Sequence, residues 1–133
     1  MPDPSISPPA AGGACADLLA ALDVASVQRL RELDPGGAHG LLERVLDTFV
    51  ASLVRHVDEL RAARADGDLA AMRHVAHTLK SSSASVGALE LSRWCADVER
   101  ALRERPAEPP DAAALDAMAA EMQRLLARAG HPA

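Results

Sequence analysis

Apolar residues recur every three or four positions along most of this chain, which is the period of an α-helix with one buried face. The first such stretch is short and begins after Asp23, whose side chain suits a helix N-cap. It ends near Asp34-Pro35-Gly36-Gly37, a strong helix breaker, and a further helical turn is expected over 17–22. The apolar positions of this short helix are Val24, Val27 and Leu30.

Four longer stretches with the same period follow, and each begins or ends at a residue that favours a helix terminus. Gly67 suits a left-handed stop and Asp68 an N-cap, so the first two long helices are joined by a very short connection. The expected helices cover 40–66, 69–86, 88–105 and the stretch between the N-cap Asp111 and the stop Gly130. Their apolar faces are, in chain order, Leu42, Val45, Leu46, Phe49, Leu53, Val57 and Leu60; Met72, Val75, Leu79, Ser83 and Val86; Leu91, Trp94, Cys95, Val98 and Leu102; and Leu115, Met118, Met122, Leu125 and Leu126.

These patterns predict an all-α fold. Aromatic residues make up 2% of the 133 residues, strand formers are scarce, and good helix formers such as Ala, Leu, Arg and Glu abound. Short connections make consecutive helices antiparallel neighbours. We therefore predict one domain over 15–130, an antiparallel up-down-up-down four-helix bundle with the short N-terminal helix capping one end. Residues 1–14 hold four prolines and two glycines without any period, which is typical of a disordered tail or linker.

The overall composition excludes several classes of function. The formal net charge is −5, and no basic face is large enough to hold a nucleic acid backbone. No apolar run reaches membrane-spanning length, so no membrane insertion is expected. The two cysteines, Cys15 and Cys95, are isolated, which fits a reduced protein of the cytoplasm. The N-terminus is acidic and rich in proline, unlike a signal peptide.

The helix expected over 69–86 carries the candidate chemistry. At 100° per residue, His77 lies about 165° from the centre of the apolar face, so its side chain should point into solvent. Lys80 and Ser81 lie three and four positions later on the same side, and Ala84 continues that strip. A neutral imidazole is a good nucleophile, a nearby lysine offers positive charge to a phosphoryl group, and small neighbours let another protein approach. The strip is typical of a phosphoryl carrier.

The same segment resembles a known family. His77-Thr78-Leu79-Lys80, Ser82-Ser83-Ala84 and Gly87-Ala88 are similar in kind and spacing to the signature of the histidine phosphotransfer (HPt) domain, HxLKGSSxxxGA. The departure is Ser81, where the family usually has glycine. Serine is small, and its hydroxyl is expected to turn back to the His77 carbonyl and stay clear of a partner.

The resemblance implies that His77 accepts a phosphoryl group from a receiver-domain aspartate and returns it or passes it to a second receiver. The implied partners are response-regulator receiver domains, a hybrid sensor histidine kinase, or both, and the chain itself is expected to be a monomer. The docking face would include His74, Ser81 and Ala84, with neighbouring parts of the preceding helix. No cofactor is expected on this chain, since the receiver would supply Mg²⁺.

Glu99, 22 positions after His77, has two interpretations. HPt domains often have Gln or Glu here, hydrogen-bonded to the imidazole; a carboxylate that accepts the Nδ1–H would fix the tautomer and leave Nε2 free to attack. Alternatively, Glu99 is a solvated helix charge paired with Arg103 at i+4. The sequence leaves both open.

Other functions remain as alternatives. The chain holds neither GxxxxGK followed by Ser or Thr nor GxGxxG, so we expect no ATP site and no autonomous kinase activity. A non-catalytic helical adaptor that binds a signalling partner is the second hypothesis, and Ser81 in place of glycine is the feature that favours it. His74 and His77 are three apart, but no carboxylate or thiol at ligand spacing completes a metal site.

Overall fold

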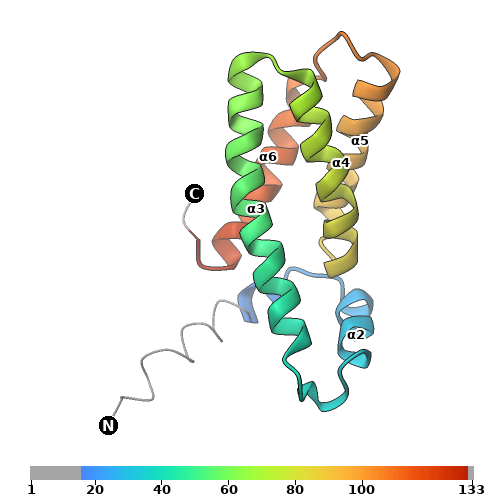
Figure 1. Cartoon of the computed structure of the whole chain (residues 1–133), viewed down its shortest axis with the longest axis vertical. Coiled ribbons are helices and arrows are strands. Elements are labelled where there is room, and N and C mark those ends of the chain that lie inside the picture. Colours follow the sequence, from blue (N-terminus) through green and yellow to red (C-terminus); the bar gives the residue numbers. More distant parts are fainter. Residues whose placement is uncertain (1–15, 132–133) are drawn as a thin grey trace.

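The computed structural model describes residues 16–131, which form a bundle of helices (Figure 1). The tail predicted over 1–14 and Cys15 lie outside the described residues. Residues 16–19 are helical and overlap the turn expected over 17–22, beginning one residue earlier. The elements that follow are α2 (Val24–Glu32), the 3-10 turn η1 (Pro35–Gly37), α3 (Leu41–Asp66), α4 (Leu69–Val86), α5 (Leu89–Glu104) and α6 (Ala112–Arg128).

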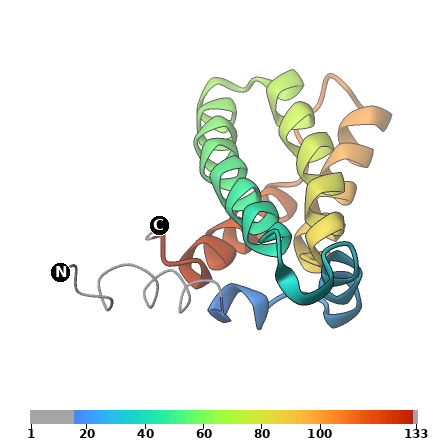
Figure 2. The ribbon, with the colours of Figure 1, turned by 60° about the horizontal axis from the view of Figure 1, so that its bottom comes forward.

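The four long helices pack side by side in a closed ring. Helix α4 contacts α3 and α5, while α6 contacts α5 and returns to α3. Consecutive long helices run in opposite directions, and α2 lies across one end of the bundle (Figures 1 and 2). The all-helical fold predicted from the apolar period is confirmed. No helix in the described part of the chain has the length and apolar character needed to cross a membrane.

The helix boundaries follow from the residues at the helix ends. Asp68 accepts a hydrogen bond from the Ala71 amide at 3.0 Å, and Asp111 accepts one from the Ala113 amide at 3.2 Å. These carboxylates satisfy amides that have no partner inside the helix. Gly67 adopts φ 66°, the left-handed conformation expected at the end of α3. The predicted termini of α3, α4, α5 and α6 are within one residue of those observed.

Gly87 has a second role, because α2 packs directly on it. The Asp23 amide donates to the Gly87 carbonyl at 2.8 Å. Gly87 has φ 88°, and a Cβ atom there would lie 2.9 Å from both the Asp23 nitrogen and the Ser26 Cβ. The absence of a side chain at this position therefore lets α2 close the end of the bundle beside the C-terminus of α4.

The apolar face predicted for α2 is wrong at Val24, which is 82% exposed, while Ser26 is buried. The reason lies in the same close packing. Ser26 faces Gly87, and its hydroxyl donates to Asp23 Oδ2 at 2.8 Å, so a small polar residue fills the contact.

Two further differences from the predicted apolar faces concern the other helices. In α3, His56 is buried although the sequence did not predict it; its Nδ1 hydrogen-bonds to the Ser52 carbonyl of its own helix at 2.8 Å. Trp94, Val45 and Val57 are only half-buried.

Candidate functional site

His77 lies on the outer side of α4, as its position on the helix predicts. The buried residues of α4 recur at helical spacing and form one face that packs into the bundle. The opposite side of the helix is therefore in solvent. The His77 side chain is 66% exposed. His74, Ser81 and Ala84 are exposed on the same helix. The buried residues of α4 are Met72, Val75, Ala76, Leu79, Ser83 and Val86.

Glu99 reaches this histidine from α5. Its side chain is only 6% exposed, since it follows Cys95 and Val98 on the packed side of the helix. One carboxylate oxygen, Oε2, contacts Nδ1 of His77, and the other, Oε1, accepts a hydrogen bond from Nζ of Lys80 at 2.6 Å. The sequence left two interpretations of Glu99 open, and the structure agrees with the one in which Glu99 contacts His77. Within the described residues, Glu99 pairs with His77 and Lys80 and not with Arg103.

The carboxylate of Glu99 is an anion at neutral pH. The hydrogen bond from Lys80 holds its pKa below the usual value, and the contact with His77 acts in the same direction, while burial opposes both. An ionised carboxylate can only accept hydrogen bonds, so Nδ1 of His77 must carry a hydrogen. Nε2 is then the ring nitrogen whose lone pair is available in the neutral imidazole.

Lys80 is held more tightly than the sequence suggested. Its side chain is 37% exposed, and its ammonium group is paired with Glu99 instead of extending freely into solvent beside His77. The backbone of the same residue is also engaged, because the hydroxyl of Ser92 on α5 donates to the Lys80 carbonyl at 2.8 Å. Sequence reasoning missed Ser92. The available signal was its spacing of seven from Glu99, which places both residues on one side of a helix.

The hydrogen bond expected from the Ser81 hydroxyl to the His77 carbonyl is not formed within the described residues. Ser81 is exposed, and in the part of the chain that the structure describes its hydroxyl does not bond to the His77 carbonyl. Two other serines of α4 make that kind of bond: Ser82 donates to the Thr78 carbonyl at 3.3 Å and Ser85 to the Ser81 carbonyl at 3.0 Å. The side chain of Ser81 is small whichever way its hydroxyl points, so the helix surface beside His77 stays open.

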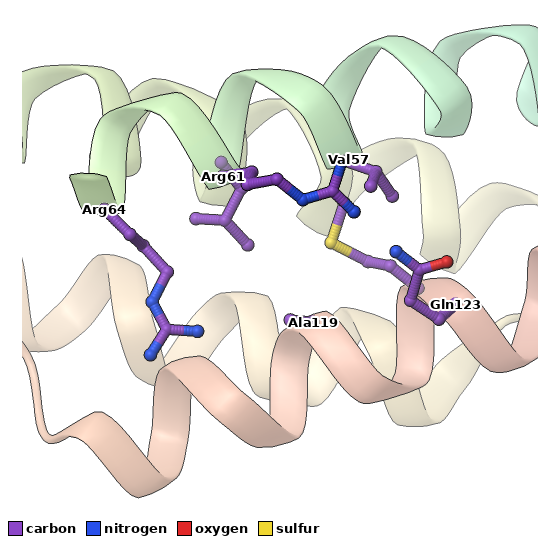
Figure 3. Close-up of a pocket in the computed structure, with 7 residues that line it drawn as sticks. Val57, Arg61, Arg64, Ala119 and Gln123 are labelled. Carbon is purple, nitrogen blue, oxygen red and sulfur yellow. The ribbon is translucent and has the colours of Figure 1, made fainter. Parts of the chain in front are cut away.

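At least two hollows lie between bundle helices within residues 16–131. One, of about 450 Å³, lies between α3 and α4 on the flank of the histidine strip, with Val45 and Phe49 among its apolar residues and Ser82 and Ser85 at its α4 side. The other, of about 270 Å³, lies between α3 and α6 (Figure 3). There Arg61 and Arg64 extend from α3, and Gln123 from α6. Since α4 and α5 form the opposite side of the ring, this second hollow is separate from His77.

The described residues contain no cluster of three or more His, Cys, Asp or Glu side chains that could hold a metal ion. His74 and His77 therefore have no third ligand of these types in residues 16–131. The chemistry that the arrangement offers is that of an exposed imidazole with one ring nitrogen held by a buried anion and a lysine beside it.

Both the sequence and the fold are similar to known proteins. Residues 44–128 match the family model described as Hpt domain. The fold is similar to the crystal structure of histidine-containing phosphotransfer protein B (HptB) from Pseudomonas aeruginosa PAO1, with a TM-score of 0.66 and 28% sequence identity. That similarity covers 80% of this chain and 88% of the other. No curated protein sequence matches the chain at a significant level.

Proposed function

The chain belongs to the Hpt domain family and functions in histidine phosphotransfer within a phosphorelay, and from this premise we propose that His77 is the residue that carries the phosphoryl group. The observation that carries the proposal is the contact between Nδ1 of the exposed His77 and the buried carboxylate of Glu99. It fixes the ring so that Nε2 faces outward as the nucleophile.

The transfer follows from that orientation. The Nε2 lone pair attacks the phosphorus of an aspartyl phosphate on the partner, a P–N bond forms, and the P–O bond to aspartate breaks with its electron pair leaving on the aspartate carboxylate. The ring keeps its hydrogen on Nδ1 and becomes positively charged as the P–N bond forms. The anionic Glu99 beside Nδ1 stabilises that developing charge without having to move.

Lys80 supplies the second charge of the site. Its ammonium group lies one helical turn from His77 and is held in place by Glu99 at 2.6 Å. A cation fixed beside the imidazole stabilises the negative oxygens of a phosphoryl group on Nε2. Glu99 therefore orients both the nucleophile and the cation.

The partner that fits this site is a receiver domain. Around His77, the exposed residues Ser81 and Ala84 have small side chains and His74 is exposed beside them. The hollow between α3 and α4 extends this surface on one flank. The receiver would bring the phosphorylated aspartate and its Mg²⁺, so the carrier needs no cofactor and no ATP site of its own. We expect a cytoplasmic monomer whose contacts with the receiver are small enough to dissociate quickly.

The test is transfer of label from a panel of purified receiver domains phosphorylated with radiolabelled acetyl phosphate. The wild-type chain should take up label in a bond that is acid-labile and base-stable, as a phosphoramidate is. His77→Gln should take up none, while His74→Gln, which removes the neighbouring exposed histidine of the docking face, should still take up label on His77. Label that persists in His77→Gln would overturn the assignment, and receiver binding without any transfer would favour the adaptor hypothesis.

A further inference from the structure

Helix α5 is bound to Lys80 of α4 at two points. Glu99 takes the ammonium group at 2.6 Å, and the hydroxyl of Ser92 donates to the backbone carbonyl at 2.8 Å. Inside an α-helix that carbonyl already accepts the amide four residues on, so the Ser92 hydroxyl occupies its second lone pair. The bond thus ties α5 to the helical backbone that carries the site.

Ser92 differs in this from other serines near the site. A serine within a helix commonly turns its hydroxyl back to a carbonyl of its own helix. Ser82 and Ser85 do so, with partners three or four residues earlier on α4. Ser92 is equally able to do this but instead reaches across to α4, twelve residues back in the chain. Its hydroxyl therefore connects two helices.

The two contacts between α5 and Lys80 differ in how firmly they fix the position of α5 along α4. Ser92 has one carbon between its backbone and its hydroxyl, and its acceptor is a backbone atom, so the bond permits little sliding between the helices. The pair of Lys80 and Glu99 is joined through long side chains that can follow a shift of the backbone. Apolar packing holds α5 against α4, but it is not directional and does not by itself orient a particular polar group.

Ser92 and Glu99 lie on the same side of α5. Seven residues separate them, which is two helical turns, about 10.5 Å along the axis and about 20° around it. A slide or rotation of α5 that moves Ser92 away from the Lys80 carbonyl therefore moves Glu99 relative to His77 as well. The short bond at one position sets the place of the carboxylate at the other.

We propose that Ser92 is a positioning residue that fixes the register of α5 against α4, so that the Glu99 carboxylate meets both Nδ1 of His77 and Nζ of Lys80. Its consequence for transfer rests on the proposed function, whereas its consequence for the histidine ring does not. Loss of the hydroxyl loosens Glu99, lowers the share of the ring held with hydrogen on Nδ1, and slows phosphotransfer by about three- to tenfold, the size expected for one neutral hydrogen bond.

The test uses Ser92→Ala, with Ser92→Thr as the variant that keeps the hydroxyl. Ser85→Ala is the matched control, because Ser85 also donates to a carbonyl on α4, but from within that helix. Nitrogen NMR of the His77 ring is recorded for each protein, with thermal melts and transfer rates from one phosphorylated receiver. Ser92→Ala should shift the ring signals and slow transfer, Ser92→Thr should keep both as in wild type, and Ser85→Ala should leave the ring signals unchanged.

Two results would overturn the proposal. One is a Ser92→Ala protein with wild-type ring signals, whatever its thermal stability, since that would make Ser92 a purely structural contact. The other is an equal change in the ring signals of Ser85→Ala. If the wild-type chain accepts no phosphoryl group, the proposed function fails, but the ring signals still decide the role of Ser92.

Discussion

At the scale of single residues, the site depends on one carboxylate that serves two donors. Glu99 is buried, yet both of its oxygens are engaged, by Nδ1 of His77 and by Nζ of Lys80. A buried charge without partners is costly, and here the partners are the two groups to which we assign the phosphoryl chemistry. The same contacts therefore stabilise the anion and orient the imidazole of His77.

This arrangement predicts separable effects of charge and hydrogen bonding. Glu99→Gln keeps an acceptor for the Nδ1 hydrogen but loses the charge, so the tautomer of His77 should persist while transfer slows by about five- to tenfold, the difference between a charge-assisted and a neutral hydrogen bond. Glu99→Ala should lose both the tautomer and the rate. Nitrogen NMR of the ring and transfer kinetics measure the two effects.

The matched control is Arg103→Ala, which removes the other partner considered for Glu99 and should change neither the ring nor the rate. Identical ring spectra in wild type and Glu99→Ala would show that the carboxylate does not orient His77.

The residue scale also shows what a sequence can and cannot predict. The outward position of His77 follows from the apolar period of its own helix, which is local information. The partner of Glu99 depends on how α5 is placed against α4, and periodicity within one helix does not contain that register. For the same reason Ser92 was missed, since its bond joins residues from two helices.

At the scale of elements, helix ends were predictable because capping is local chemistry. Asp68 and Asp111 cap the helices they precede, and Gly67 ends α3 in the left-handed conformation. The orientation of α2 was not predictable in full. Its contact with Gly87 needs a small residue, so Ser26 is buried while Val24 is exposed, against the rule that apolar residues lie inside.

Gly87 and Gly67 allow the packing of α2 to be tested. Both are left-handed C-caps, with φ 88° and 66°, so alanine is strained at either position by about 1 kcal/mol. Only at Gly87 would the new Cβ collide, at 2.9 Å from Asp23 and Ser26; at Gly67 nothing lies within 4 Å. Gly87→Ala should therefore lower the free energy of unfolding by roughly 1–3 kcal/mol more than Gly67→Ala.

Denaturant titration of the two variants beside wild type gives the comparison. Equal losses in both would mean that α2 does not press on Gly87 in solution.

At the scale of the whole molecule, the ring of four helices places the histidine strip and the hollow of Figure 3 on different sides. The short connections between α3, α4 and α5 made antiparallel neighbours predictable. The closure of the ring by α6 against α3 depends on the longer connection over 105–111, whose prolines indicate a break in the helix but not the direction of the next one.

The stability of the whole fold should report the ionisation of Glu99. Its pKa is lower in the folded chain than the ordinary value of 4.5, so the unfolded chain binds the proton more tightly. The stabilisation of the fold by the ionised Glu99 carboxylate is therefore complete above about pH 4.5, and it is lost as the pH falls through the pKa of Glu99 in the folded chain. Urea titrations of wild type and Glu99→Gln should give a difference in unfolding free energy that shrinks below that pH; a difference that stays constant down to pH 3 would contradict this.

The proposed transfer requires that Nε2 of His77 forms the bond to phosphorus while Nδ1 stays with Glu99. Nuclear magnetic resonance of the phosphorylated chain, labelled with ¹⁵N in histidine, tests it most directly, because a P–N bond gives a one-bond coupling between ³¹P and the bonded nitrogen. Attack by Nε2 predicts this coupling at Nε2 of His77 alone. A coupling at Nδ1, or at the ring of another histidine such as His74, would contradict it.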